Sequence, residues 1–140
     1  MDNITRPRWP AHLFADFEVL ANQIEQYVRT LGTISFAELV DAAGGGARGN
    51  CSLYMRGNER ILYWGRLSNT IAIAIDRLVN EGRIRLRPVC FFRYVMDGAI
   101  SSLPIADPER LSRYRKTRWL PVVMTLPGPR RPLEPLECWR

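Results

Sequence analysis

Apolar residues recur at three- and four-residue steps in three segments, and each of these segments predicts an amphipathic helix. The first runs to Leu31 and ends at Gly32, and its apolar stripe consists of Phe17, Leu20, Ala21, Ile24, Tyr27, Val28 and Leu31. The second covers Phe36 to about Ala43 and begins with a capping box, in which the Ser35 hydroxyl and the Glu38 carboxylate each bind the other residue's amide. It ends at the glycines that start at Gly44.

The third helix is expected to begin with Ser68 or Asn69 as its N-cap and to run to about Glu81, with Gly82 as its end. Its predicted buried face consists of Ile71, Ala74, Ile75, Leu78 and Val79. A step of about 100° per residue then places the following residues outward: Asn69, Ile73, Asp76, Arg77 and Asn80.

Other segments have the shorter period of strands. Thr33-Ile34 and Ile61–Trp64 are short extended candidates, and basic and apolar residues alternate over Arg83–Arg87. Residues 90–96 are predicted as a return strand that completes a hairpin and ends at the Asp97-Gly98 turn. Residues 44–65 form an insertion between the second and third helices, predicted as a loop, in which Cys51–Met55 fits either a helical turn or a strand.

The C-terminal part is less regular. Asp107-Pro108 is a good helix start, so a short helix is expected over about 108–117, followed by a β-prone segment from Trp119 to Leu126. Prolines and arginines fill residues 127–140, which are expected to be an extended, mobile tail. The predicted organisation is one domain over 1–103, a basic helix and strand over 104–126 that pack on it, and the tail.

The segment SNTIAIAIDRLVNEGRIRLRPVCFFRYVMDG combines a serine-capped helix, an acid-glycine end and a strand with alternating arginines. With the helices before it, residues 33–98 resemble the winged helix-turn-helix superfamily, in a pattern similar to MarR-like proteins. The layout also resembles, more weakly, small winged-helix proteins of prophages and integrative elements. The resemblance implies an α+β fold of three helices plus a β-hairpin wing, here with a basic C-terminal extension.

The distribution of charged residues indicates the kind of partner that the chain could bind. The net charge is +6, and arginine supplies 19 of the 20 basic residues, with Lys116 the only lysine. Residues 1–60 carry six arginines against seven acids, a net of −1, whereas residues 61–140 carry fourteen basic residues against seven acids, a net of +7. An arginine-rich half favours a polyanion or an acidic protein surface as the partner, although a solvated surface that aids solubility has the same composition.

The outward face of the third helix is the first candidate site. In a winged helix it would enter the major groove of double-stranded DNA, with Arg77 on a guanine edge and Asn69 or Asn80 on an adenine edge. Thr70 joins this set, and Ile73 could contact a thymine methyl group, with Asp76 positioning Arg77. The same face would also suit a protein partner, because Ile73 is apolar and Asp76 repels phosphates.

Two further basic clusters complete the candidate DNA contacts. Arg83, Arg85 and Arg87 project from one face of the predicted wing strand, and Arg93 could add to them from the return strand. Phosphate contacts by this stripe would hold a duplex without reading its sequence, whereas the structural alternative is an edge strand protected by charge. The second cluster comprises Arg110, Arg113, Arg115, Lys116 and Arg118, mixed with Tyr114 and Trp119, which are more simply core anchors.

Catalytic and metal chemistry has little support. His12 is the only histidine and has no nearby cysteine or paired acid, and the glycine-rich segment after Ala43 lacks the Gly-Lys-Ser/Thr ending of a phosphate loop. We therefore expect no enzyme activity, no catalytic residues, no metal site and no cofactor. The three cysteines are odd in number and far apart, and we find neither a secretory signal nor a membrane-spanning segment, so a cytoplasmic location is expected.

The sequence thus predicts a DNA-binding regulator or mobile-element accessory factor that reads the major groove with helix 69–81 and clamps phosphates with the 83–96 wing. The alternative is a winged-helix module for protein–protein interaction, such as a phage-borne protein that binds a host polymerase or replication component. A homodimer joined through the first helix is a third reading. No membrane partner is expected.

Overall fold

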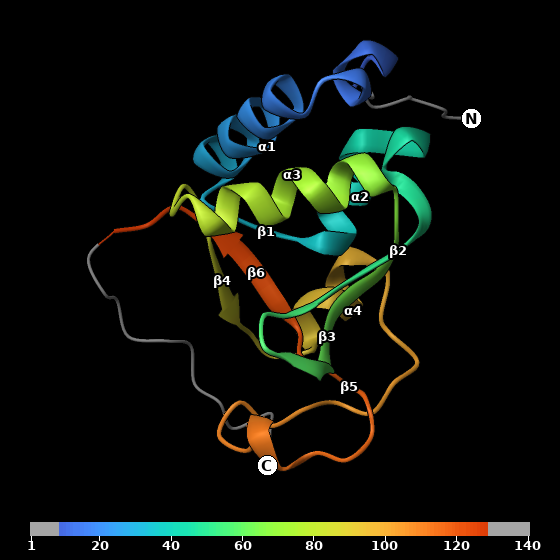
Figure 1. The fold of residues 1–140 in the computed structure, drawn as a ribbon, viewed down its shortest axis with the longest axis vertical. Coiled ribbons are helices and arrows are strands. Elements are labelled where there is room, and N and C mark those ends of the chain that lie inside the picture. Colours follow the sequence, from blue (N-terminus) through green and yellow to red (C-terminus); the bar gives the residue numbers. More distant parts are fainter. Residues whose placement is uncertain (1–8, 129–140) are drawn as a thin grey trace.

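The computed structural model describes residues 9–128, which form an α+β fold, as predicted. In Figure 1, helix α3 (Asn69–Asn80) crosses the middle of the molecule, with α1 (Phe17–Leu31) above it and the β2–β3 hairpin (Arg48–Met55 and Asn58–Leu67) below. Within this part of the chain there are two three-stranded sheets. One has the order β1-β6-β4 and the other β2-β3-β5.

The helix boundaries follow from side-chain caps, and the caps of the second and third helices are those that the sequence predicts. The Asp16 carboxylate accepts the first free amides of α1, and Gly32 ends this helix at a φ of 87°, which an L side chain rarely adopts. Helix α2 (Phe36–Ala43) has the predicted capping box between Ser35 and Glu38. The Ser68 hydroxyl accepts the Ile71 amide to cap α3.

The first sheet pairs strands that are far apart in the sequence. Strand β6 (Val122–Thr125) lies in its centre and pairs antiparallel with β1 (Thr33–Ser35) and with β4 (Arg85–Pro88). The β-prone segment expected from Trp119 to Leu126 is thus β6 together with part of β5 (Arg118–Trp119), which runs parallel to β3 in the second sheet. Because β4 and β6 are far apart in sequence, residues 89–121 form a long connection between paired strands.

The prediction of a β-hairpin directly after Gly82 is wrong. Residues predicted as the return strand, Cys90–Met96, instead contain helix α4 (Phe92–Asp97). Tyr94 is buried in this helix, and its hydroxyl accepts the Phe36 amide at 3.1 Å and donates to the Val122 carbonyl at 2.6 Å. Burial raises the pKa of Tyr94. Helix α4 is therefore fixed between α2 and β6, and it occupies the chain positions where the strand was expected.

Residues 44–65 also differ from the predicted loop. After a short 3₁₀ turn (Gly44–Ala47) they form β2 and most of β3, which settles the open choice for Cys51–Met55 in favour of a strand. The hairpin is tied to the start of α3, because the Ser68 amide donates to the Ala47 carbonyl at 2.7 Å. Gly49 lies against this junction, where an added Cβ would come within 2.8 Å of the Leu67 carbonyl oxygen.

The helix expected over about 108–117 does not form. The segment contains a turn and a 3₁₀ helix (Leu111–Arg113), and individual hydrogen bonds hold it in place. The Asn58 side-chain amide donates to the Leu111 carbonyl, and the Tyr114 hydroxyl accepts the Asp107 amide. Trp119 is buried and donates through its indole to the Tyr63 carbonyl, so Trp119 anchors the end of this segment to β3.

Cys51 has a free thiol, whereas Cys90 is disulfide-bonded, so the odd number and wide spacing of the cysteines do not exclude a disulfide. No helix within residues 9–128 is long and apolar enough to cross a membrane. Most of the predicted mobile tail, residues 129–140, lies outside the described part of the chain.

Candidate nucleic-acid interface

The outward strip of α3 is exposed as predicted. Ile71, Ala74, Ile75 and Leu78 face the core. The exposed residues are Asn69, Ile73, Asp76, Arg77 and Asn80, and Thr70 is half-buried. Val79, which the sequence places inward, is 36% exposed, so the apolar character of the surface is greater than expected.

The arginines nearest to the C-terminal half of α3 are occupied by acids. Arg77 binds Glu18 of α1 at 3.1 Å and Glu81 at 3.6 Å. Arg83 binds Glu25 at 2.7 Å and also contacts Glu18 and Glu81. The hydrogen bonds that Arg83 donates to Glu25, and next to Glu81, raise the pKa of Arg83 above its ordinary value. Two of the predicted DNA contacts are therefore joined to an acidic network that Glu18 and Glu25 of α1 form together with Glu81.

The other polar groups of the strip have partners within the chain as well. Asn80 donates to Asp76 at 3.1 Å, and Arg56 from the hairpin turn lies 4.0 Å from the same carboxylate. The Asn69 amide oxygen accepts a weak hydrogen bond from the Cys51 thiol at 3.6 Å. Asp76 thus organises Asn80 and Arg56, and it does not position Arg77 as the sequence suggested.

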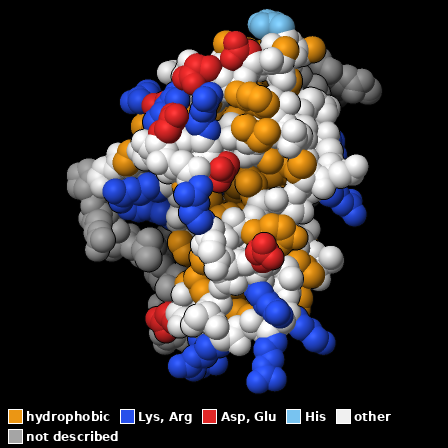
Figure 2. All heavy atoms as spheres, in the orientation of Figure 1, with side chains coloured by type: hydrophobic (Ala, Val, Ile, Leu, Met, Phe, Trp, Pro, Cys, Tyr) orange, Lys and Arg blue, Asp and Glu red, His pale blue; other side chains and the backbone are white. Residues whose placement is uncertain are grey.

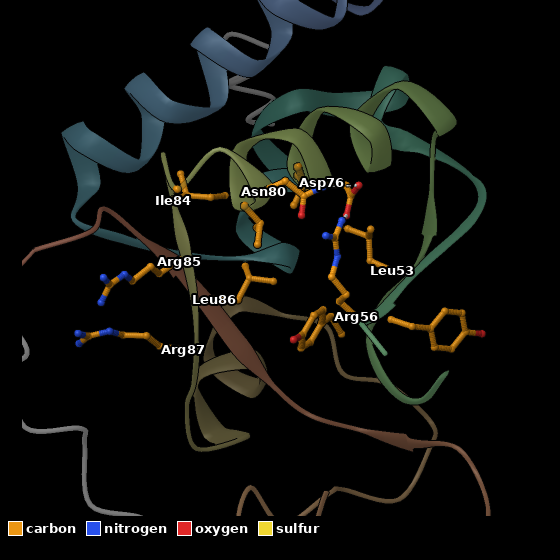
Figure 3. Close-up of a pocket in the computed structure, with 13 residues that line it drawn as sticks. Leu53, Arg56, Asp76, Asn80, Ile84, Arg85, Leu86 and Arg87 are labelled. Carbon is orange, nitrogen blue, oxygen red and sulfur yellow. Dashed lines mark hydrogen bonds and ion pairs between the residues drawn. The ribbon is translucent and has the colours of Figure 1, made fainter. Parts of the chain in front are cut away.

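Strand β4 presents two arginines that are free of acids. Arg85 and Arg87 are two residues apart, so both project from the same face of the strand, while Arg83 lies before the strand begins. Figure 3 shows their side chains pointing away from the groove beneath α3, with Leu86 pointing into it. Neither arginine has an ion pair within residues 9–128.

Two more acid-free arginines lie at the opposite end of α3, and sequence reasoning missed them. Arg48 begins β2 and is paired in register with Leu67, and Arg66 precedes Leu67 in β3. Both side chains are exposed, and neither forms an ion pair in the described part of the chain. Arg66 has a φ of 56°, which is unusual for a residue with a side chain. The sequence signal that could have identified Arg66 is its position two residues before Ser68, which caps α3.

Arg93 is not available as an outward contact. From α4 its guanidinium binds Glu38 at 2.6 Å and Asp97 at 3.1 Å, and it donates to the side-chain and backbone oxygens of Thr33. Desolvation lowers the pKa of Arg93, but the hydrogen bonds and charges of Glu38 and Asp97 together outweigh it and raise the pKa overall. The predicted contribution of Arg93 to a wing stripe fails because its segment is a helix that faces the core.

The basic segment near the C-terminus forms a separate cluster at the turn end of the β2–β3 hairpin. Arg113, Arg115 and Lys116 are exposed, and no ion pair is recorded for them among the described residues. Arg118 lies over the Tyr114 ring at 4.5 Å, and Arg110 is 3.7 Å from Asp107. Figure 2 shows Lys and Arg side chains gathered at the lower end of this face and at its margins, with acids and arginines intermingled over α1.

Between these basic groups lies an open groove of about 590 Å³, bordered by α3, β4 and the β2–β3 hairpin (Figure 3). Its walls are largely apolar and include Leu53, Ile75, Val79, Ile84 and Leu86. Tyr63 also lines it, and burial raises the pKa of this tyrosine. Within residues 9–128 no group of three or more His, Cys, Asp or Glu side chains is placed to hold a metal ion.

Comparison of the chain with protein-family models, with curated proteins and with solved structures finds no match.

Proposed function

We propose that the protein is a winged-helix protein that binds double-stranded DNA through the exposed strip of α3 and the arginines on either side of it. The order of elements supports this class, because α1, β1, α2, α3, β4 and β6 follow one another as in a winged helix. The β2–β3 hairpin is then an insertion between the second and third helices, and residues 89–121 replace the short wing tip.

The observation that carries the proposal is the placement of acid-free arginines at both ends of α3. Arg48 and Arg66 lie at its N-terminal end, and Arg85 and Arg87 follow its C-terminal end. A helix of 12 residues is about 18 Å long, and the major groove is about 12 Å wide. A helix lying in that groove would therefore bring an arginine pair near the phosphates on each side.

The proposed roles differ from residue to residue. Arg48, Arg66, Arg85 and Arg87 bind phosphates, and the cluster of Arg113, Arg115 and Lys116 extends the contact along the duplex. Asn69, Thr70 and Ile73 are the strip residues that remain for base edges. Since Arg77 and Arg83 are held by acids, affinity comes mainly from phosphates, and discrimination between sequences is small.

The test is fluorescence anisotropy of a labelled mixed-sequence duplex, titrated with protein at several salt concentrations. The logarithm of the binding constant should fall with the logarithm of salt concentration by roughly 0.9 for each phosphate contact. The double variant Arg85→Gln/Arg87→Gln should weaken binding and reduce that slope by about 2. Arg66→Asn should act in the same direction by about half as much, because Asn tolerates the left-handed backbone and only the cation is lost.

Arg29→Gln is the matched control, because it also removes one exposed arginine, from an ion pair with Glu25 on α1. Its binding and salt slope should stay close to those of the unmodified protein. Salt-independent binding, no binding at micromolar protein, or an equal effect of the Arg29 and Arg66 substitutions would refute the proposal.

A protein partner is the second candidate function, and the groove beneath α3 is the observation that favours it. The apolar residues of its walls offer nothing to phosphates, whereas apolar side chains of a protein would fit against them, although Arg56, Arg85 and Arg87 also line the groove. The Leu86 side chain points into this groove (Figure 3), so Leu86→Glu would place a charge there. If the groove binds a protein, a nuclease-treated pull-down with the unmodified protein should retain that partner, and Leu86→Glu should lose it. If the protein binds DNA instead, the arginine variants should lose duplex binding.

A further inference from the structure

An open hollow of about 700 Å³ lies beside the arginines at the N-terminal end of α3. Its walls come from α2, the start of β2, the second half of β3 and the loop after α4. The lining combines two cations, one indole ring and several apolar side chains: Arg48 and Arg66, Trp64, and Val40, Leu62, Ile100 and Leu103. Cations and an aromatic ring therefore border the same space.

Strand β3 sets the order of these groups in the hollow. Leu62, Trp64 and Arg66 alternate along the strand and all three line the hollow, so they project from the same face. Leu62 is buried, Trp64 is half-buried and Arg66 is exposed, so the row runs from the floor of the hollow to its rim. The Trp64 ring packs on Tyr94 and Trp119, with ring centroids 5.0 and 5.7 Å away. The indole is thus a fixed platform at the side of the hollow.

Two acids also line the hollow, and they limit where an anion fits. Asp97 accepts hydrogen bonds from Ser35 at 2.6 Å and from Arg93 at 3.1 Å, so its charge is already compensated. Asp41 is exposed on α2, where its charge repels a phosphate. A phosphate therefore fits at the arginine end of the hollow, and an uncharged flat ring fits further inside, against Trp64.

We propose that the hollow binds one unpaired nucleotide of a DNA strand, with its base stacked on Trp64 and its phosphate held by Arg48 and Arg66. A nucleotide joins a flat aromatic ring to a phosphate, which is the combination that the lining accommodates. The inference rests on the proposed DNA binding, in which the same two arginines hold duplex phosphates. A strand that leaves the duplex at these arginines has its next base beside the hollow, so the protein favours duplexes with an unpaired end.

Fluorescence anisotropy with labelled duplexes of one paired sequence tests this inference. One duplex is blunt, another carries a short single-stranded extension of adenines, and another carries an equally long extension without bases. The two extended duplexes have the same phosphates, so the ratio of their affinities measures the base alone. The unmodified protein should bind the adenine extension at least about fivefold more tightly than the abasic one, the lower end of the gain from stacking one base on an aromatic ring.

Two variants remove the base site in different ways. Ile100→Glu places a charge in the hollow without altering the core, because Ile100 is 58% exposed, and Trp64→Leu removes the platform. Each should abolish the preference for adenine, and the ratio between the two extensions cancels any effect of the added charge on phosphate binding. Val95→Glu is the matched control, because it adds the same charge at an exposed position of α4 outside the lining of the hollow, and it should keep the preference.

Competition separates the nucleotide from its phosphate. Excess deoxyadenosine monophosphate should remove the preference, whereas inorganic phosphate at the same ionic strength should not. Circular dichroism checks that the variants fold, and Ile100→Glu alone decides the test if Trp64→Leu does not.

Equal binding of the two extensions by the unmodified protein would overturn the inference. So would a preference that a folded hollow variant retains, that Val95→Glu loses, or that phosphate alone removes. The blunt duplex reports on the proposed function separately. Blunt-duplex binding without a base preference refutes only this inference, and a base preference without blunt-duplex binding refutes only the duplex proposal.

Discussion

The Tyr94 hydroxyl is a single group that connects three parts of the fold, and Tyr94→Phe removes it with almost no change of shape. The side chain is fully buried. Its hydroxyl accepts the Phe36 amide at the start of α2 and donates to the Val122 carbonyl in β6. Phe36 is the first residue of its helix, so its amide has no partner within the helix. Val122 is paired in register with Pro88, which has no amide to donate.

These contacts set the expected size of the effect. A buried donor or acceptor left without a partner costs about 1–3 kcal/mol, so losing the hydroxyl between two buried backbone groups should destabilise the protein by about 2–4 kcal/mol. For a chain of this size, 1 kcal/mol corresponds to a change in melting temperature of about 3–4 °C. The variant should therefore melt roughly 6–16 °C below the unmodified protein.

Urea unfolding followed by circular dichroism measures this free energy, and an unchanged slope with denaturant would show that both proteins unfold in the same way. Tyr54→Phe is the matched control, because Tyr54 is exposed at the edge of the hairpin and should change stability by less than about 0.5 kcal/mol. If Tyr94→Phe were as mild as this control, the hydroxyl would not join α4 to α2 and β6, and the reasoning would be refuted.

Three further predictions follow from contacts described above. Gly49→Ala should destabilise by about 1–3 kcal/mol in the same urea assay, because its Cβ would meet the Leu67 carbonyl oxygen at 2.8 Å, whereas Gly45→Ala has open space and should be nearly neutral. Burial raises the pKa of Tyr94 in the folded state, so the stability contributed by its neutral form is complete below pH 10 and is lost as pH rises above that value; a pH series should show this loss in the unmodified protein and a smaller one in Tyr94→Phe. Glu18→Gln releases Arg77 and Arg83 from one shared acid, so anisotropy should show tighter duplex binding, and unchanged binding would mean that neither arginine approaches DNA.

Helices α1, α2 and α3 were predictable because their signals are local. Asp16, Ser35 and Ser68 cap these helices through hydrogen bonds to amides two or three residues away, and apolar spacing identifies most of each buried face. In α1 the two ends of the predicted stripe, Phe17 and Leu31, are exposed. The exposed strip of α3 followed from the same spacing. Only Val79 was misplaced, because it lies at the edge of the buried stripe, beside the open groove.

Residues 90–96 show why the rest could not be read locally. The aromatic and β-branched residues of this segment favour a strand. The structure instead pairs Arg93 with Asp97 one helical turn apart and places the Tyr94 hydroxyl between two distant backbone groups. The strand that does pair with β4 comes more than thirty residues later, and no local pattern identifies a partner at that separation.

The candidate site was predictable in part for the same reason. Alternation correctly placed Arg85 and Arg87 on one side of a strand. It could not show that Arg83 meets Glu25 or that Arg77 meets Glu18, since those acids belong to α1, about sixty positions earlier. Arg48 and Arg66 became candidates only when the hairpin brought them to the start of α3.

The central position of β6 has a consequence for how the chain folds during synthesis. Strands β1 and β4 do not pair with each other and meet only through β6, which is the last strand of residues 9–128. While a ribosome is still producing the connection over residues 89–121, the helices can collapse around their apolar faces, but the first sheet has no middle strand. We therefore expect nascent chains arrested before Val122 to be protease-sensitive at β1 and β4, and to become protected abruptly once Thr125 has left the exit tunnel.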